Sequence, residues 1–213
     1  MAARLPESGH EALSGHNVSR ETFSRLETYV AVLLNWQKRI NLIGPSTIEQ
    51  VWTRHVADAL QLIPLLPPHT KTLGDLGSGA GIPGLVLAIA TGHHVHLYES
   101  NARKAAFLRE AIRQTGASAT IHHGRIEALM REQPRPRVDV ILARAFAPLV
   151  KLLEYAAPFL EDGAIGLFHK GQDVDMELTS ATKCWIIVAV KHPSTIDPSG
   201  VMLEVREATR VKS

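Results

Sequence analysis

Five glycines stand within eleven residues in the segment GDLGSGAGIPG, which spans residues 74–84. The short apolar run KTL precedes this segment, and the apolar run LVLAIA follows it. Glycine lets another molecule come into contact with the main chain, and a strand, a glycine loop and a helix in succession present free N–H groups to a ligand. The segment therefore predicts a site that binds a small molecule.

One interpretation of the loop is a dinucleotide site. Gly79, Gly81 and Gly84 match the GxGxxG pattern of NAD-binding proteins, and Glu99 ends the next β-type run, where an acid would bind a ribose hydroxyl. This pattern alone leaves a nucleotide-dependent oxidoreductase open as an alternative.

A second interpretation starts two residues before the first glycine of the loop. Asp75 followed by Gly77, Gly79 and Gly81 is typical of sites for S-adenosylmethionine (SAM), which carries an ammonium and a sulfonium but no phosphate. An acid beside the loop attracts such a cation, whereas it would repel a pyrophosphate. Glu99 suits both ligands, because both contain a ribose. The acid favours SAM, and NAD stays the alternative.

The residues after the fourth β-type run restrict the methyl acceptor. Methylation of an exocyclic amine commonly needs a Pro-Pro-aromatic turn there, and residues 141–148 read ILARAFAP instead. Methylation of a pyrimidine carbon needs a cysteine nucleophile nearby, but Cys184 starts a late strand. Ring nitrogens such as guanine N7 remain. N7 has a free lone pair, so alignment of donor and acceptor replaces a general base.

Two cations follow neighbouring strands of the expected sheet. Arg144 ends the fourth β-type run and Lys170 ends the fifth. Both could position a nucleotide through its phosphate or the acceptors of its base edge, and the alternative is that they are ordinary cations at strand ends. We expect Arg144 and Lys170 at the reaction site.

Strand and helix patterns alternate from residue 71 onward, which predicts a doubly wound, mostly parallel α/β sheet. The last two β-type runs, 184–192 and 201–209, flank the turn-rich segment PSTIDPSG and predict an antiparallel C-terminal hairpin. Before this core we expect a flexible tail over residues 1–18 and a helical portion over 19–70, with helices beginning near Ser19 and covering about 48–66. We expect the core, residues 71–213, to be one globular unit.

Bulk composition excludes several classes of protein. The chain of 213 residues has a formal net charge of +2, and its apolar runs are too short to cross a membrane. The N-terminus lacks the apolar core of a secretory signal, and one cysteine cannot form an internal disulfide. The histidines have no companions at metal-ligand spacing. We expect a cytoplasmic, monomeric protein that binds neither a membrane nor a metal.

Several motifs in order resemble those of one bacterial family. The chain from about residue 25 to its end is similar to the small-subunit rRNA methyltransferase G family, also called glucose-inhibited division protein B. The matching motifs are Asn41-Leu42-Ile43, His55 with Asp58, Asp75 to Gly84, Glu99-Ser100, Arg125-Ile126-Glu127, Arg144-Ala145-Phe146-Ala147 and Lys170-Gly171.

The resemblance implies a class I SAM-dependent methyltransferase with a Rossmann-like core. Its acceptor would be N7 of one guanine in the decoding-region loop of 16S rRNA, in the small ribosomal subunit. By motif match, Gly77 and Ile82 would line the SAM pocket, Ile126 and Glu127 would flank the adenine, and Arg144 would lie where cofactor and substrate meet. A ribosome-binding module without enzymatic activity is a further alternative.

The resemblance also implies that the helix face shared by His55 and Asp58, three residues apart, closes against the glycine loop, and a purely structural cap is the alternative. Two positions depart from the family pattern. Ala59 stands where a serine is frequent, and His169 precedes Lys170 where an aliphatic residue is usual. The second departure bears on how Lys170 is held.

Overall fold

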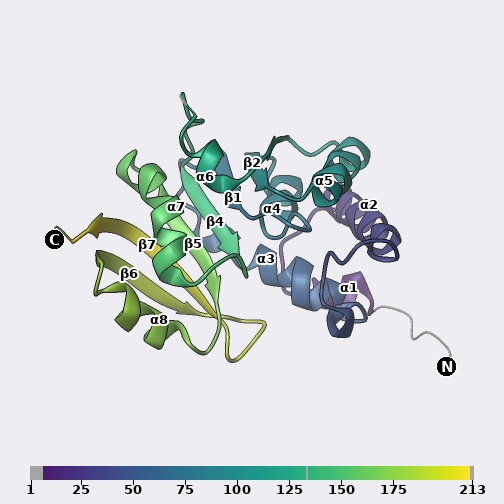
Figure 1. Cartoon of the computed structure of the whole chain (residues 1–213). Helices are drawn as coiled ribbons and strands as arrows, with labels where there is room; N and C mark the ends of the chain where they lie inside the picture. Colours follow the sequence, from purple (N-terminus) through teal and green to yellow (C-terminus); the bar gives the residue numbers. More distant parts are fainter. Residues whose placement is uncertain (1–6, 133, 212–213) are drawn as a thin grey trace.

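The described residues of this computed structural model, 7–132 and 134–211, form one seven-stranded sheet between two layers of helices (Figure 1). The spatial order is β3-β2-β1-β4-β5-β7-β6. The pairings from β3 to β5 are parallel, and β7 is antiparallel to both β5 and β6. The strands are β1 Thr72–Leu76, β2 His94–Glu99, β3 Ala119–His123, β4 Val140–Arg144, β5 Ile165–Lys170, β6 Trp185–Pro193 and β7 Val201–Arg210. The predicted doubly wound sheet with a terminal hairpin is confirmed.

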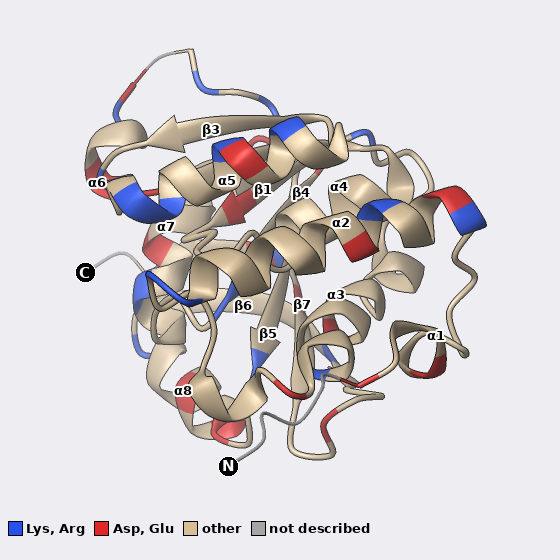
Figure 2. Cartoon of the chain, turned by 90° about the vertical axis from the view of Figure 1, so that its right-hand side faces the viewer, with Lys and Arg blue, Asp and Glu red and all other residues tan. Residues whose placement is uncertain are grey.

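Helices cover both faces of the sheet because the central strands are apolar on both sides. Along β4, Val140 and Leu142 join one hydrophobic core, and Ile141 and Ala143 join the other. The first core lies under α2 Arg20–Gln37, α4 Gly84–Thr91 and α5 Ala102–Thr115, and the second under α7 Leu149–Glu161 and α8 Val174–Ala181. The short helix α6 Ile126–Leu129 follows β3. Acidic and basic residues are interspersed along the outer helices (Figure 2), as the small net charge suggests.

The N-terminal helical portion shares the first core with the sheet. Ser19 caps α2 by accepting a hydrogen bond from the Thr22 N–H at 3.1 Å, as the sequence predicts. The fully buried Tyr29 of α2 donates its hydroxyl proton to the backbone carbonyl of Ala80 at 2.7 Å. This helix therefore braces the glycine loop directly.

The single helix expected over residues 48–66 is wrong in detail. The segment contains a π-helical turn, η2 Trp52–Ala57, then α3 Asp58–Leu60 and a 3₁₀ turn, η3 Ile63–Leu65, and η1 Pro45–Thr47 precedes them. Pro64 inside η3 has no N–H to continue an α-helix.

In the segment expected to be a flexible tail, the described residues 7–18 contain a short helix and several packed contacts, and residues 1–6 lie outside the described residues. A short helix, α1 Gly9–Ala12, packs Gly9 against the ring of Trp52, and Leu13 is buried. The carboxylate of Glu7 accepts hydrogen bonds from the N–H and hydroxyl of Thr53 at 2.6 and 2.8 Å. A helix of four residues is too short to give a periodic apolar pattern, so the sequence carries no signal for it.

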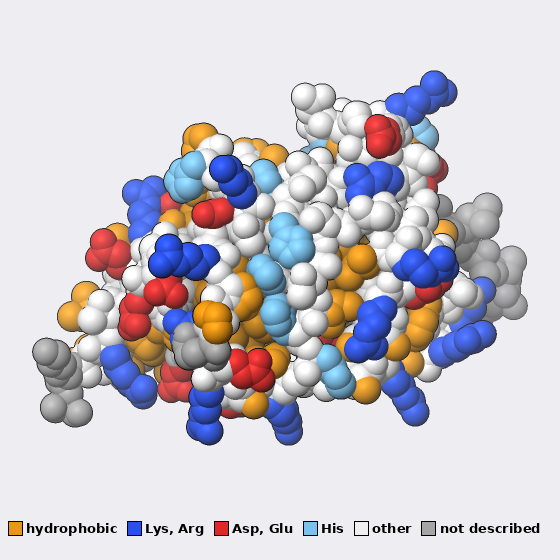
Figure 3. All heavy atoms as spheres, turned by 90° about the horizontal axis from the view of Figure 1, so that it is seen from above, with side chains coloured by type: hydrophobic (Ala, Val, Ile, Leu, Met, Phe, Trp, Pro, Cys, Tyr) orange, Lys and Arg blue, Asp and Glu red, His pale blue; other side chains and the backbone are white. Residues whose placement is uncertain are grey.

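Histidine side chains form a row on one face of the molecule (Figure 3). On β2 and β3, a ring nitrogen of His96 lies 2.9 Å from one of His122, and His94 contacts Ser118 and Thr120. Burial lowers the pKa of His96 to about 4. Within the described ranges, no three His, Cys, Asp or Glu side chains are arranged to hold a metal ion, and no helix is long and apolar enough to cross a membrane.

Asp75 is a carboxylic acid inside the core, beneath the glycine loop. Its side chain is fully buried, and Oδ2 accepts a hydrogen bond from the Gly84 N–H at 3.2 Å. A Cβ on Gly84 would lie 2.7 Å from Asp75 Oδ2, so only glycine lets α4 approach β1 this closely. Burial raises the pKa of Asp75 to about 7. The hydrogen bonds with Gly84 and Ser78 oppose this shift, and the charge of Glu99 adds to it.

We expect Asp75→Asn to make the stability of the cofactor-free protein less dependent on pH. A raised folded-state pKa means that the folded protein binds more protons than the unfolded chain between pH 3.8 and about 7. The free energy of unfolding of the wild type therefore decreases as the pH rises through this window. Asparagine does not titrate, so the free energy of unfolding of the variant should decrease by about 1–3 kcal/mol less. Denaturant unfolding at pH 5 and pH 8 measures the effect. A difference between the two proteins that stays constant with pH would contradict it.

Candidate active site

The carboxyl ends of the parallel strands meet at one edge of the sheet, where the chain reverses its direction of winding between β1 and β4. Ligands of open α/β sheets bind at such a point. In the described part of the chain, cavities of about 370, 290 and 480 Å³ lie at this edge, and Ala145, the residue after β4, lines all of them. We call them the first, second and third cavity in that order.

The glycine loop forms one wall of the first and second cavities. Gly77 has a φ of +68°, a conformation that favours glycine, and a Cβ there would overlap the ring of Phe146. Gly79 donates its N–H to the Glu99 carboxylate at 2.8 Å. Gly81 faces away from the cavities, since a Cβ on it would meet Leu85 and Leu108. Gly77 and Gly79 of the loop therefore line the cavities, whereas Gly81 allows close packing against the helices.

The first cavity contains the residues expected around a nucleoside. Glu99, Ile126 and Glu127 all line it, with Gly77 at the loop end. Glu99 is held by the N–H groups of Gly79 and Asn101, and Glu127 accepts the hydroxyl proton of Tyr155 at 2.6 Å. An apolar side chain beside fixed carboxylates suits a purine and the hydroxyls of its ribose.

The second cavity lies on the other side of the loop. Gly77, Gly79, Ile82 and Arg144 line it, together with His55 from the N-terminal helices. The π-helical turn therefore faces the loop, in line with the face expected for His55. Its Nε2 lies 2.7 Å from the hydroxyl of Thr47. Burial, with the charges of Arg144 and Arg54, lowers the pKa of His55 to about 3, so its ring is neutral near pH 7.

Asp75 and Gly81, both expected among the cofactor contacts, line neither the first nor the second cavity of the described structure, and one lining residue was not expected. Asp75 lies fully buried under the loop, where it orders the backbone through Gly84. Lys104, which sequence reasoning missed, lines both the first and the second cavity. The sequence could have indicated Lys104, because it lies in the first turn of α5, shortly after Asn101, whose side chain caps that helix.

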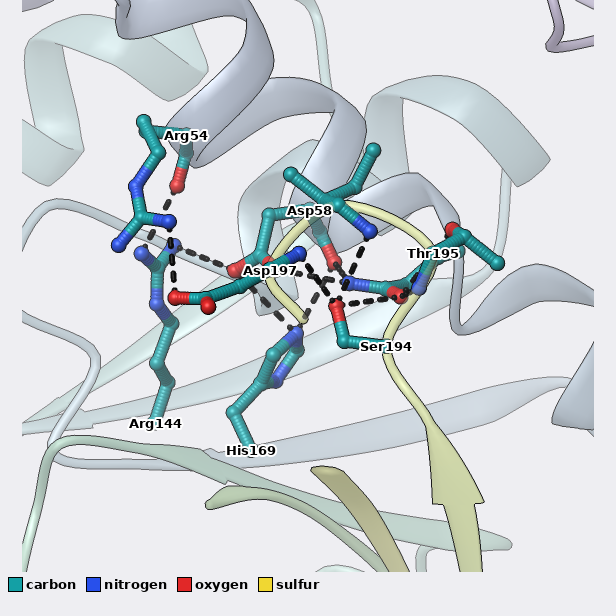
Figure 4. Close-up of polar contacts among 9 residues, drawn as sticks. Arg54, Asp58, Arg144, His169, Ser194, Thr195 and Asp197 are labelled. Atoms are coloured by element: carbon teal, nitrogen blue, oxygen red, sulfur yellow. Dashed lines mark hydrogen bonds and ion pairs between the residues drawn. The ribbon is translucent and has the colours of Figure 1, made fainter. Parts of the chain in front are cut away.

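Arg144 is held in place by the N-terminal helices (Figure 4). Its Nη2 donates to the backbone carbonyl of Arg54 at 2.9 Å, and its Nη1 lies 3.2 Å from Asp58 Oδ2. The Nη1 contact is an ion pair without hydrogen-bond geometry, so this buried donor has no hydrogen-bond partner in the described structure. The sequence analysis expected Arg144 at the end of this strand, where it lies, but it gave no partner for its side chain.

His169 and Asp197 complete this network. The His169 Nε2–H donates to the backbone carbonyl of Asp58 at 2.9 Å, and burial lowers the pKa of His169. Arg54 pairs with Asp197 in the turn between β6 and β7 at 2.8 Å. Side chains from the N-terminal helices, from β4 and β5, and from the terminal hairpin thus converge on Asp58 and Arg144 (Figure 4).

Lys170 is less free than the sequence suggested. Its side chain is 8% exposed, and its ammonium lies 2.6 Å from Glu177 Oε2 and 3.3 Å from the carbonyl of Ala147. Lys170 and Glu177 both line the third cavity, with Phe146 and Ala147. Glu177, on α8, is a site residue that no motif indicated.

Comparisons with known proteins identify the family of this chain. The family model described as rRNA small subunit methyltransferase G matches residues 22–199. The "Ribosomal RNA small subunit methyltransferase G" of Rhodospirillum rubrum is 53% identical over 193 residues, covering 91% of this chain and 94% of that protein. The protein of the same name from Methylorubrum populi is 50% identical over 203 residues, covering 93% and 95%.

A solved structure shows the same fold. The O-methyltransferase TomG from Streptomyces achromogenes, in complex with SAM, is 12% identical and superposes with a TM-score of 0.58 over 92% of this chain and 94% of that chain. The family match over most of the chain and the two relatives at half identity lead to one conclusion: this chain belongs to the rRNA small subunit methyltransferase G family.

Proposed function

We propose that this protein transfers a methyl group from SAM to N7 of a guanine in the decoding-region loop of 16S rRNA. The observation that carries the proposal is the junction of the first and third cavities. Both are lined by Ala145, Phe146 and Ala147, so a nucleoside in one lies next to a base in the other. The names of the curated relatives support small-subunit rRNA as the acceptor.

The residues around the first two cavities fit SAM. Glu99 and Ile126 suit its ribose and adenine. Gly77 has no side chain, so it leaves space beside Phe146 that a Cβ would occupy. When bound, SAM supplies a methyl group on a positively charged sulfur. Arg144 and Lys104 line the second cavity and suit the carboxylate of its methionine portion.

The chain's own residues contribute alignment more than proton transfer. With SAM and guanine held in line, the N7 lone pair would take the methyl group as its bond to the positively charged sulfur breaks, the electron pair staying on sulfur, so no proton would have to leave. His55 and His169 are held neutral by burial, so they add no positive charge beside a product ring that becomes cationic. The ion pair with Asp58 and the contact with the Arg54 carbonyl fix Arg144 next to the reacting atoms.

Family membership favours methyl transfer over the oxidoreductase alternative, since the family is one of methyltransferases. The product analysis below distinguishes an enzyme from a ribosome-binding module without activity. A monomer acting in the cytoplasm stays a prediction.

We expect Gly77→Ala to lower the affinity for SAM at least about tenfold, because the added Cβ overlaps Phe146 and moves it into the cradle. Gly92→Ala is the matched control. Gly92 has a φ of +77°, but no atom lies within 4 Å of the position that a Cβ would take, so the substitution brings the same backbone strain outside the site. Calorimetry gives the Kd of both variants, and equal Kd values would contradict the prediction.

We expect Arg144→Ala to slow single-turnover methyl transfer by about 100-fold, since a group that positions the reactants is lost. Arg113→Ala removes an exposed guanidinium paired with Glu110 on α5 and should leave the rate unchanged. Rapid-quench measurements with small ribosomal subunits test both. A rate close to that of the wild type for Arg144→Ala would reject its role.

The reaction itself is tested by methyl transfer from labelled SAM to small ribosomal subunits from cells that lack this protein. We expect the label in 7-methylguanosine after digestion to nucleosides. Label in another nucleoside would keep the methyltransferase and overturn the acceptor atom, and no label at all in active subunits would favour the non-enzymatic alternative.

A further inference from the structure

The third cavity carries a pair of opposite charges that the transfer of a methyl group does not require. It lies at the ends of β4 and β5, between the first residues of α7 and α8. Lys170 and Glu177 both line it and form an ion pair. Phe146, Pro148 and Leu152 supply an apolar surface. An apolar slot with few placed polar groups is the usual form of a pocket for a base turned out of its stack.

The carboxylate of Glu177 has one oxygen in use and one free. Oε2 accepts hydrogen bonds from the Leu149 N–H, which begins α7, and from the Lys170 ammonium. Oε1 makes no hydrogen bond to the described residues, and the side chain is 26% exposed. Glu177 is therefore held firmly by one oxygen while the other remains able to accept.

The order of the residues matches the order of atoms around guanine. N7 lies on one side of the base, O6 is next to it, and the N1–H and N2 amine donors lie on the far side. Lys170 lies between Ala147, which lines both the first and the third cavity, and Glu177, because its ammonium contacts the Ala147 carbonyl at 3.3 Å and the Glu177 carboxylate at 2.6 Å. With N7 directed to the junction, Lys170 meets O6 and Glu177 meets the donors of N1 and N2.

We propose that Glu177, held by Lys170 and the start of α7, reads the N1–H and N2 amine of the target guanine and so determines which base is methylated. The proposal rests on the function proposed above, because it needs guanine as the acceptor. Adenine has no proton on N1 and no N2 amine, so its edge presents a lone pair to the carboxylate. A carboxylate oxygen that the bound base covers and leaves without a donor is penalised, and discrimination against adenine follows.

The test uses small-subunit RNA in which the guanine identified by the product analysis is replaced by inosine. Inosine keeps N7, O6 and N1–H but lacks the N2 amine. Wild-type enzyme should methylate the inosine RNA with a kcat/KM about tenfold lower than the guanine RNA. Glu177→Ala should be slow on both and treat them alike, within about twofold.

Asp175→Ala is the matched control, because Asp175 lies on the same helix, pairs with Lys191 at 2.7 Å and is 74% exposed. It should keep the wild-type preference for guanine. Glu177→Gln, whose amide oxygen still accepts from the Leu149 N–H, serves if the alanine variant does not fold, and it should show a reduced preference.

The outcomes separate the proposals. A purely structural Glu177 would lower both rates equally and leave the preference for guanine intact, which would overturn the inference. A wild type that methylates guanine and inosine equally well at N7 would overturn it as well, without affecting the proposed function. A wild type that forms no 7-methylguanosine would overturn the proposed function and this inference together.

Discussion

The contact between Asp58 and Arg144 connects the parts of this structure that the reaction needs. Asp58 begins the short helix α3, and Arg144 ends β4 at the centre of the sheet. Both side chains are mostly buried, so each charge depends on the other, and loss of one partner would leave an uncompensated charge. The N-terminal helices are therefore fixed at the edge of the sheet where the cavities lie, and they supply His55 to the second cavity.

Ala145 turns the chain between two different environments. Its φ of +49° is uncommon for a residue with a Cβ, and strain of this kind is found at functional sites, where surrounding contacts maintain it. Before it, Arg144 is directed toward the N-terminal helices; after it, Phe146 lies over Gly77. One strained residue thus places a cation and an aromatic ring on two sides of the same junction.

The sequence was sufficient where a local pattern determines structure. Alternating apolar runs predicted the strands and the hairpin, and the glycine spacing located the loop. The pattern could not reveal α1, which has four residues, or the pairing of His169 with Asp58, which lie 111 residues apart. Glu177 was missed for a related reason. Its partner Lys170 is seven residues away across a strand end and a helix start, a spacing that indicates no contact until the chain is folded.

Asp75 and Glu99 show why burial decides the role of an acid that sequence alone assigns to a ligand. Both were expected to contact the cofactor, and both accept a hydrogen bond from an N–H of the glycine loop. Asp75 lies inside β1 with its side chain fully buried, so it can only order the loop from below, and ionisation there is opposed by burial. Glu99 ends β2 at the edge of the sheet and lines the first cavity while holding Gly79. The acid at the strand end can therefore serve loop and ligand together, because a carboxylate oxygen accepts more than one hydrogen bond.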